Sequence, residues 1–216
     1  MIFKIVSHDL KMPTNNLLTL TQRLDAKIPN ISTDWLIDYS KKINLIAVNT
    51  VNTVNNLLFW SNKEANNSVI IEDIFVFDCI HDILETFNIY AKVLQKTLSF
   101  ECENRNLTVK CNRVQFLTLL KNIISNAIKY SALENGVILI KTFAEKDHVI
   151  ITVEDNGNGD FENVSSIFFS TEQNKLDSHM SGMGFKICKE IATKYSIIIS
   201  FEQSEKLKGI KVGIKI

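Results

Sequence analysis

The chain has 216 residues, enough for two folding units, and 45% of them are hydrophobic and 22% charged, as is typical of globular proteins. Its 24 lysine and arginine residues balance 24 aspartate and glutamate residues, which excludes the global positive field that would hold nucleic acid or an anionic membrane surface. No stretch approaches the ~18 continuous apolar residues of a membrane span, so we expect a cytoplasmic portion without nucleic acid or membrane contact. Whether the full-length protein is membrane-anchored stays open.

Two stretches with helical periodicity make up residues 1–64. Apolar side chains recur at three- and four-residue steps over about residues 2–26, Pro29 ends this stretch, and a second periodic stretch covers residues 35–58. Together they predict an antiparallel helical hairpin. Because two amphipathic helices leave apolar stripes uncovered, we expect a second copy to complete a four-helix bundle, which makes the protein a homodimer through the hairpin.

The pattern changes after a polar stretch, and residues 65–216 are expected to form a second domain. Its strands occur in adjacent, hairpin-like pairs, which predicts an α+β layer and not a doubly wound parallel sheet. The expected helices cover about residues 78–93, 113–130 and 185–195, and the expected strands cover 137–143, 148–154, 197–201 and 210–216.

His8 lies in the first helical stretch, next to Asp9 and five residues before Pro13. A proline inside a helix clashes with the carbonyl four residues back, here that of Asp9, so the kink is expected beside His8. An imidazole with a pKa near about 6.5 is largely neutral at cytoplasmic pH, so one ring nitrogen can attack a phosphorus atom while the other donates to a carboxylate. The alternative is an ordinary surface histidine beside a helix-kinking proline.

Asn122, Asn126 and Lys129 follow one another at steps of four and three residues on the second predicted helix of the second domain. This spacing places two amides and an ammonium on one helix face, which suits a polyphosphate bound to a metal ion. Mg²⁺ prefers oxygen ligands and keeps several waters, so Asn126 and Asn122 are candidate metal ligands. The alternative is chance, since asparagine is frequent throughout this chain.

Asp155, Gly157 and Gly159 come directly after a predicted strand. An ionised Asp155 can accept a hydrogen bond from the exocyclic amine of adenine, whereas guanine presents a carbonyl oxygen at that position. The two glycines are expected to let the backbone approach the base. An ordinary turn is the alternative interpretation of this segment.

Gly182 and Gly184 precede the helix predicted at residues 185–195, where backbone N–H groups and the helix dipole favour a phosphate. Four of the seven glycines of the chain lie in this pair and the preceding one. The polar stretch at about residues 160–180 exceeds the usual length of a structureless loop and is a lid candidate, anchored by the apolar cluster at 167–169. A disordered connector is the alternative.

In order and spacing, these segments resemble the five boxes of sensor histidine kinases. His8 with its Ser-His-Asp-Leu-Lys-x-Pro context resembles the H box, residues 122–130 the N box, 155–159 the G1 box, 167–169 the F box and 182–184 the G2 box. The resemblance covers essentially the whole chain. It implies a dimerisation and histidine-phosphotransfer hairpin in residues 1–64 and an α/β sandwich ATP-binding domain of the Bergerat type in residues 65–216.

The resemblance also implies the activity and the site residues. ATP with Mg²⁺ would phosphorylate His8 with help from Asp9, and the phosphoryl group would pass to an aspartate on the receiver domain of a response regulator. Asn126 would be the principal Mg²⁺ ligand and Asn122 its helper, with Asp155 as the adenine anchor. The remaining ATP contacts would be Lys129, Tyr130, Gly157, Gly159, Gly182, Met183, Gly184 and Phe185.

Some positions depart from the family pattern. Met12 stands one helical turn after His8, where many members carry a polar residue that helps dephosphorylate the regulator, so we expect little phosphatase activity. Met180 replaces the first glycine of the fuller G2 pattern. These departures motivate an alternative, a catalytically weak nucleotide-binding scaffold that signals through its bundle. A protein-serine kinase of the same nucleotide fold is a third possibility, but that class has no need for the H box.

Overall fold

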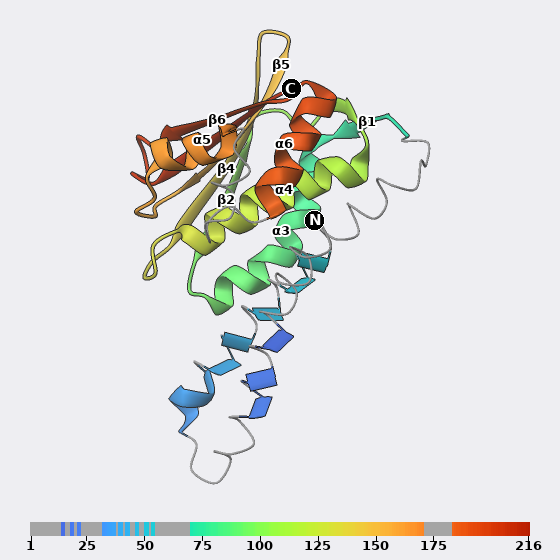
Figure 1. Cartoon of the computed structure of the whole chain (residues 1–216). Helices are drawn as coiled ribbons and strands as arrows, with labels where there is room; N and C mark the ends of the chain where they lie inside the picture. The colour runs from blue at the N-terminus through green and yellow to red at the C-terminus, as the bar shows by residue number, and fades with distance from the viewer. Residues whose placement is uncertain are drawn as a thin grey trace. The chain divides into compact units, whose positions relative to one another are not determined.

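The chain divides into two compact units, Met1–Asn67 and Ser68–Ile216 (Figure 1). The computed structural model describes residues 14–15, 18–19, 21–22, 32–37, 39–40, 42–43, 46–47, 50–51, 53–54, 70–170 and 183–216. In the first unit the described residues are helical except Ser32, and the rings of Trp35 and Tyr39 stack with their centroids 4.3 Å apart. The bundle of two hairpins stays a prediction. Among the described helices, none has the length and apolar character needed to cross a membrane.

The described part of the second unit contains strands and helices in an α+β order. They are β1 (Glu72–Phe75), α3 (Val76–Val93), β2 (Thr97–Cys102), β3 (Thr108–Cys111), α4 (Arg113–Tyr130), β4 (Val137–Glu145), β5 (His148–Asp155), α5 (Phe161–Phe169), α6 (Met183–Tyr195), β6 (Ile198–Gln203) and β7 (Ile210–Lys215). The structure therefore contains all three helices and all four strands that the sequence pattern predicted in this unit, with bounds within about two residues of the predicted ones.

The main sheet has the strand order β2-β4-β5-β7-β6. β4–β5, β5–β7 and β6–β7 are antiparallel, while β2 lies parallel to β4, so the sheet is mixed and not built of hairpin pairs alone. β1 and β3 form a separate antiparallel pair. Figure 1 shows α3, α4 and α6 on one face of the main sheet, which gives the two-layer α/β sandwich. The α+β fold class is thereby confirmed for this unit.

The core lies between this helical layer and the sheet. Register places Phe100, Ile140, Val153, Val212 and Phe201 in one row across all five strands, on the face that the helices cover. On α4 the apolar side chains recur at three- and four-residue steps and are buried against it. They are Phe116, Leu119, Leu120, Ile123, Ile124, Ala127 and Ile128. Burial of apolar surface stabilises the fold by about 25 cal/mol per Å². The packing of this apolar face therefore stabilises α4 more than the intrinsic helix propensity of its residues does.

Helix α4 has defined ends. Asn112 caps its N-terminus, because the side-chain oxygen accepts a hydrogen bond from the N–H of Gln115 at 3.1 Å. The helix stops at Tyr130, after which the N–H of Ser131 donates to the carbonyl of Ala127 at 2.9 Å. These two ends fix the helix along the sheet, and its last turns face the end of β5.

The segment expected as a lid is helical in its first half. Asp160 caps α5 by accepting hydrogen bonds from the N–H groups of Glu162 and Asn163, at 3.0 and 3.2 Å. The lid candidate at residues 160–180 therefore begins with a helix, and a disordered connector is excluded for residues 161–169. None of these nine residues is glycine or proline, but a helix this short carries little periodic signal. Residues 171–182 lie outside the described part of the chain.

Candidate functional site

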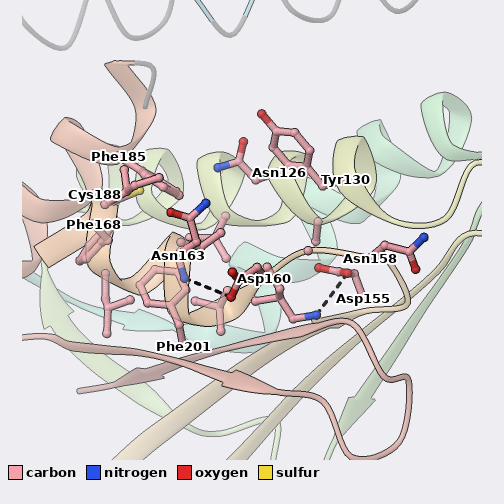
Figure 2. A pocket seen from close by; sticks show the side chains of 18 residues that line it. Asn126, Tyr130, Asp155, Asn158, Asp160, Asn163, Phe168, Phe185, Cys188 and Phe201 are labelled. Carbon is pink, nitrogen blue, oxygen red and sulfur yellow. Dashed lines mark hydrogen bonds between the residues drawn. The ribbon is translucent and has the colours of Figure 1, made fainter. Parts of the chain in front are cut away.

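A cavity of about 320 Å³ lies between the helical layer and the end of the sheet (Figure 2). Its walls come from α4, α5, α6 and the ends of β5, β6 and β7. The polar side chains among its lining residues are Asn126, Tyr130, Asp155, Asn158, Asp160 and Asn163. The remaining walls are mainly aliphatic and aromatic. A flat apolar ring with a few polar edge atoms suits such a cavity.

Asp155 ends β5 and is 6% exposed. Its Oδ1 accepts hydrogen bonds from the N–H of Gly157 at 2.8 Å and of Ile210 at 3.3 Å. Burial raises the pKa of this carboxyl, while the two N–H donors and the charge of Lys96 lower it. Within the described residues Oδ2 has no hydrogen-bond partner, so it is the acceptor that remains for a ligand.

The glycines of this region provide space and not an unusual backbone conformation, since no described glycine has a positive φ. A Cβ on Gly157 would overlap the backbone carbonyl of Tyr130, and one on Gly159 would lie 2.6 Å from Cδ1 of Ile210. We expected these glycines to admit the base to the backbone. Gly157 lets the loop after β5 pack against the end of α4, whereas Gly159 lines the cavity, and the contact of these glycines with a base stays a prediction.

The candidate residues of α4 separate into two groups. Asn126 and Tyr130 line the cavity, and Figure 2 shows their side chains one turn apart on the same helix. Asn122 is 9% exposed and does not line it; its Nδ2 donates to the carbonyl of Thr118 at 2.9 Å. Lys129 is exposed, with Nζ 4.8 Å from the Tyr130 ring centroid, and it lies outside the cavity lining.

The candidate residues at the start of α6 also differ in place. Phe185 lines the cavity. Gly184 packs against α4, because a Cβ there would lie 2.8 Å from Oδ1 of Asn122. Met183 begins the helix, and its side chain is outside the described structure. Gly182, like His8 and Asp9, is a predicted site residue that lies outside the described residues.

Two residues that sequence reasoning missed hold the loop after β5 in place. Asn156 accepts hydrogen bonds from the N–H groups of Ala132 and Val137, at 3.3 and 2.9 Å, and donates to the carbonyl of Asn135 at 3.0 Å. Gly209 leaves no room for a side chain, since a Cβ would overlap Asp155 and lie 2.6 Å from the N–H nitrogen of Gly157. The sequence offered one signal for Gly209, because an isolated glycine directly before a predicted strand often marks a close approach of two backbone segments.

An aromatic cluster forms the floor of the cavity away from Asp155. Phe168 of α5 lies with its ring centroid 5.5 Å from Phe185 of α6 and 5.1 Å from Phe201 of β6. Offset and edge-to-face arrangements of this kind stabilise a pair by about 0.5–1.5 kcal/mol beyond the area buried. A hydrogen bond also connects α6 with the end of α5, because Nζ of Lys189 donates to the carbonyl of Ser170 at 3.1 Å. Short helix α5 is thereby fixed to the sheet and to α6.

Replacement of Phe168 by alanine is expected to lower the free energy of unfolding by about 3–5 kcal/mol, because the ring is 6% exposed and contacts the rings of Phe169, Phe185 and Phe201. Phe169 is 54% exposed, so Phe169→Ala should cost less than about 1 kcal/mol. Urea unfolding followed by circular dichroism compares the two variants. Equal costs would contradict the anchoring role of Phe168.

The sandwich, the carboxylate at the end of β5 and the asparagine on α4 define a nucleotide-binding domain of the ATPase class. Residues 111–216 match the family model described as histidine kinase-, DNA gyrase B-, and HSP90-like ATPase. In these residues the chain matches the ATP-binding domain that histidine kinases carry.

Relatives and solved structures agree with this family. The chain is 25% identical over 194 residues to the aerobic respiration control sensor protein ArcB homolog of Haemophilus influenzae, covering 87% of this chain and 58% of that one. It is 24% identical over 191 residues to the alginate biosynthesis sensor protein KinB of Pseudomonas aeruginosa, covering 86% and 31%. The chain therefore spans less than two thirds of these relatives.

The fold is shared with solved kinases. The catalytic domain of histidine kinase ThkA superposes with a TM-score of 0.59 at 23% identity, covering 68% of this chain and 95% of that chain. Histidine kinase ThkA in complex with the response regulator protein TrrA gives a TM-score of 0.62 at 20% identity, covering 100% of this chain and 60% of that chain. At this identity the likeness concerns the fold alone.

Proposed function

We propose that the chain is a protein-histidine kinase that phosphorylates His8 from ATP and passes the phosphoryl group to an aspartate of a response regulator. The observation that carries the proposal is the cavity in which Asn126 and Tyr130 of α4 lie opposite Asp155 of β5. The names of the relatives as sensor proteins and the matched ATPase family support it.

Asp155 would bind the adenine end of the nucleotide. With Oδ1 held by two backbone N–H groups, the ionised Oδ2 can accept from the exocyclic amine of adenine. The apolar walls would cover the faces of the base, and Tyr130 lies at the rim, where it is 44% exposed. This arrangement favours adenine over guanine, whose carbonyl oxygen would meet the carboxylate.

Asn126 would bind at the phosphate end, where its amide lines the cavity. A bound Mg²⁺ would neutralise the phosphate charge, and amide oxygen is a ligand that this ion accepts. We propose Asn126 as the principal ligand. Asn122 is buried beside Gly184, so we propose that it holds the start of α6 against α4 and assists Asn126 from there.

In the proposed reaction a ring nitrogen of His8 forms a bond to the γ-phosphorus as the bond to the oxygen bridging the β- and γ-phosphates breaks, and ADP leaves. Asp9 would accept a hydrogen bond from the N–H of the other ring nitrogen and so stabilise the cationic ring as it forms. Since phosphoryl transfer of this kind depends on positioning and charge neutralisation, the rigid cavity would supply most of the catalysis.

The hairpin of residues 1–64 would dimerise and present His8, and the receiver domain of a response regulator would be the second partner. The structure of ThkA with a response regulator, which shares this fold, supports that partner. We propose a cytoplasmic placement for the chain. The catalytically weak scaffold is not favoured, because several relatives are named as histidine kinases.

The test is labelling of the full chain with γ-³²P-ATP and Mg²⁺. We expect phosphate that is labile to acid and stable to alkali, as is typical of phosphohistidine, and complete loss of it in His8→Gln. The matched control is His81→Gln, since His81 lies exposed on α3, with a side chain that is 54% exposed, and its replacement should leave labelling unchanged.

Equal labelling of His8→Gln and the wild type would reject His8 as the phosphoacceptor. Binding of ATP without any labelling of the wild type would reject the kinase and favour the scaffold. Both variants should bind ADP with the wild-type affinity, because His81 does not line the cavity and His8 is proposed to accept the phosphoryl group and not to hold the nucleotide. This binding shows that the variants are folded.

A further inference from the structure

Lys96 is a buried lysine that the proposed reaction does not use. It lies directly before β2 and is 9% exposed, which is rare for a lysine unless its ammonium is paired. Its Nζ donates to two backbone carbonyls, those of Ile128 at 2.5 Å and Ser131 at 3.3 Å. Both carbonyls belong to the C-terminal end of α4, where the helix dipole favours a positive charge.

The end of α4 that Lys96 holds is part of the cavity wall. Tyr130 lies between the two carbonyls in sequence and lines the cavity, and its own carbonyl packs against Gly157. A Cβ on Gly136 would lie 2.9 Å from Cγ of Lys96, so the loop from α4 to β4 closes directly over the lysine stem. Asn156 holds the same loop from the other side.

Lys96 and Asp155 lie on the same face of the sheet, on either side of β4. Parallel pairing of Thr97 with Val137 brings Lys96 beside Gly136, and antiparallel pairing places Asp155 opposite Ile138. Burial lowers the pKa of Lys96 and the charge of Asp155 raises it, while Lys96 in turn lowers the pKa of Asp155. The two groups therefore stabilise each other's charged form.

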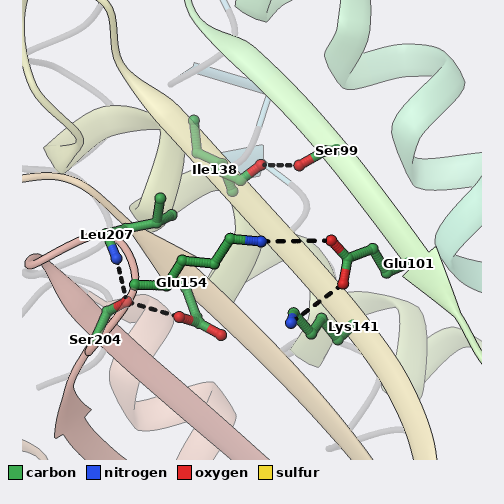
Figure 3. A network of polar contacts seen from close by, with 8 residues as sticks. Ser99, Glu101, Ile138, Lys141, Glu154, Ser204 and Leu207 are labelled. Carbon is green, nitrogen blue, oxygen red and sulfur yellow. Dashed lines mark hydrogen bonds and ion pairs between the residues drawn. The ribbon is translucent and has the colours of Figure 1, made fainter.

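Other charged groups near this pair are solvated or point away. Glu154 precedes Asp155 in β5 and so lies on the opposite face of the sheet, where it accepts from Ser204 at 2.6 Å (Figure 3). The charged residues on the neighbouring elements are exposed, and water screens them: Lys92, Lys129, Glu134 and Lys208. Among the residues described, Lys96 is the one charged side chain that acts on Asp155.

We propose that Lys96 is a positioning residue of the nucleotide site, which fixes the end of α4 against the loop after β5 and provides a positive charge on the face of the sheet that carries Asp155. The inference rests on the proposed function, since it assumes that Asp155 binds the base. Lys96 does not line the cavity, so its effect on the nucleotide passes through Asp155 and Tyr130.

The experiment measures the dissociation constant of ADP for the full chain by calorimetry at several pH values, together with thermal unfolding. Lys96→Met retains the apolar stem and removes the charge and the donors. We expect ADP affinity to fall about tenfold at neutral pH, the loss of about one charge-assisted interaction. The acidic limb of the affinity profile should move to higher pH, because Asp155 then loses the charge that lowers its pKa.

Two further variants separate charge from packing. Lys96→Arg keeps a positive charge and should keep the acidic limb near that of the wild type, even where its bulk lowers stability. Lys96→Gln can still donate to the carbonyl of Ile128 but is neutral, so it should move the limb as Lys96→Met does. It also replaces Lys96→Met in the test if that variant does not fold.

Ile83→Val is the control for stability alone. Ile83 is 1% exposed on α3 and does not line the cavity, so its shortening should lower the melting temperature without moving the pH limb. A neutral Lys96 variant that behaved like Ile83→Val would overturn the proposal and leave Lys96 a purely structural residue. Failure of the wild type to bind ADP would instead reject the proposed function itself.

Discussion

Asp155→Asn is expected to weaken ATP binding by about 100-fold, or about 3 kcal/mol, without destabilising the nucleotide-free fold. Asn can accept the two backbone N–H bonds of Gly157 and Ile210 through Oδ1, as the carboxylate does. Its amide nitrogen then replaces Oδ2 and points a donor at the exocyclic amine of adenine, which is itself a donor. The same amide can donate to the carbonyl oxygen of guanine, so the preference for ATP over GTP should fall as well.

The stability of this variant follows from the raised pKa of Asp155. Because burial raises the pKa above that of the unfolded chain, the folded state holds the proton more tightly. The pKa of Asp155 is lower in the unfolded chain than in the folded protein. As the pH rises through the range between these two values, the free energy of unfolding therefore decreases. Asn carries no charge and avoids that decrease. At neutral pH the variant should therefore be as stable as the wild type or more stable.

The matched control is Asp160→Asn. Asp160 also lines the cavity, but it caps α5 through two backbone N–H groups, and asparagine is an equally good cap. Its ATP affinity should stay within about twofold of the wild type. Calorimetry with ATP and GTP and urea unfolding without nucleotide measure all three proteins. Similar losses in both variants, or clear destabilisation by Asp155→Asn, would contradict the assignment of Asp155.

The sequence could predict those elements whose pattern is long and regular. Helix α4 has eighteen residues with a clear apolar stripe, and β4 and β5 are long strands with a short connection. Strand β2 was missed because it is a half-exposed edge strand with no fully buried residue, and β1 has only four residues. The parallel pairing of β2 with β4 joins segments forty residues apart, which no local pattern encodes.

The candidate site was predictable in its side chains but not in its backbone contacts. Asn126 and Asp155 were identified by residue type and position in the sequence, Tyr130 was implied by the family resemblance, and all three line one cavity. Lys96 and Asn156 act on backbone groups that are distant in sequence, and such partners leave no motif. Whether each residue performs its predicted role stays a prediction for the experiments above.

The role of a glycine is equally hard to predict from the sequence, because it depends on which atoms of distant segments lie against the glycine. Gly209 and Gly213 flank the start of β7, four residues apart, and neither has a positive φ. A Cβ on Gly209 would meet rigid backbone, at Asp155 and at the N–H nitrogen of Gly157. A Cβ on Gly213 would lie 2.5 Å from Oγ of Ser200, a side-chain atom that can rotate away.

Gly209→Ala is therefore expected to lower the free energy of unfolding by about 3 kcal/mol and to weaken ATP binding more than tenfold, since the backbone of Asp155 must shift to relieve the overlap. Gly213→Ala should change the free energy of unfolding by less than about 1 kcal/mol, because rotation of Ser200 relieves its contact and alanine loses less chain entropy than glycine on folding. Urea unfolding and calorimetry with ATP compare the pair. If both variants bind ATP like the wild type, the close packing of Gly209 on Asp155 does not set the geometry of the adenine site, and the carboxylate must be held by its two N–H donors alone.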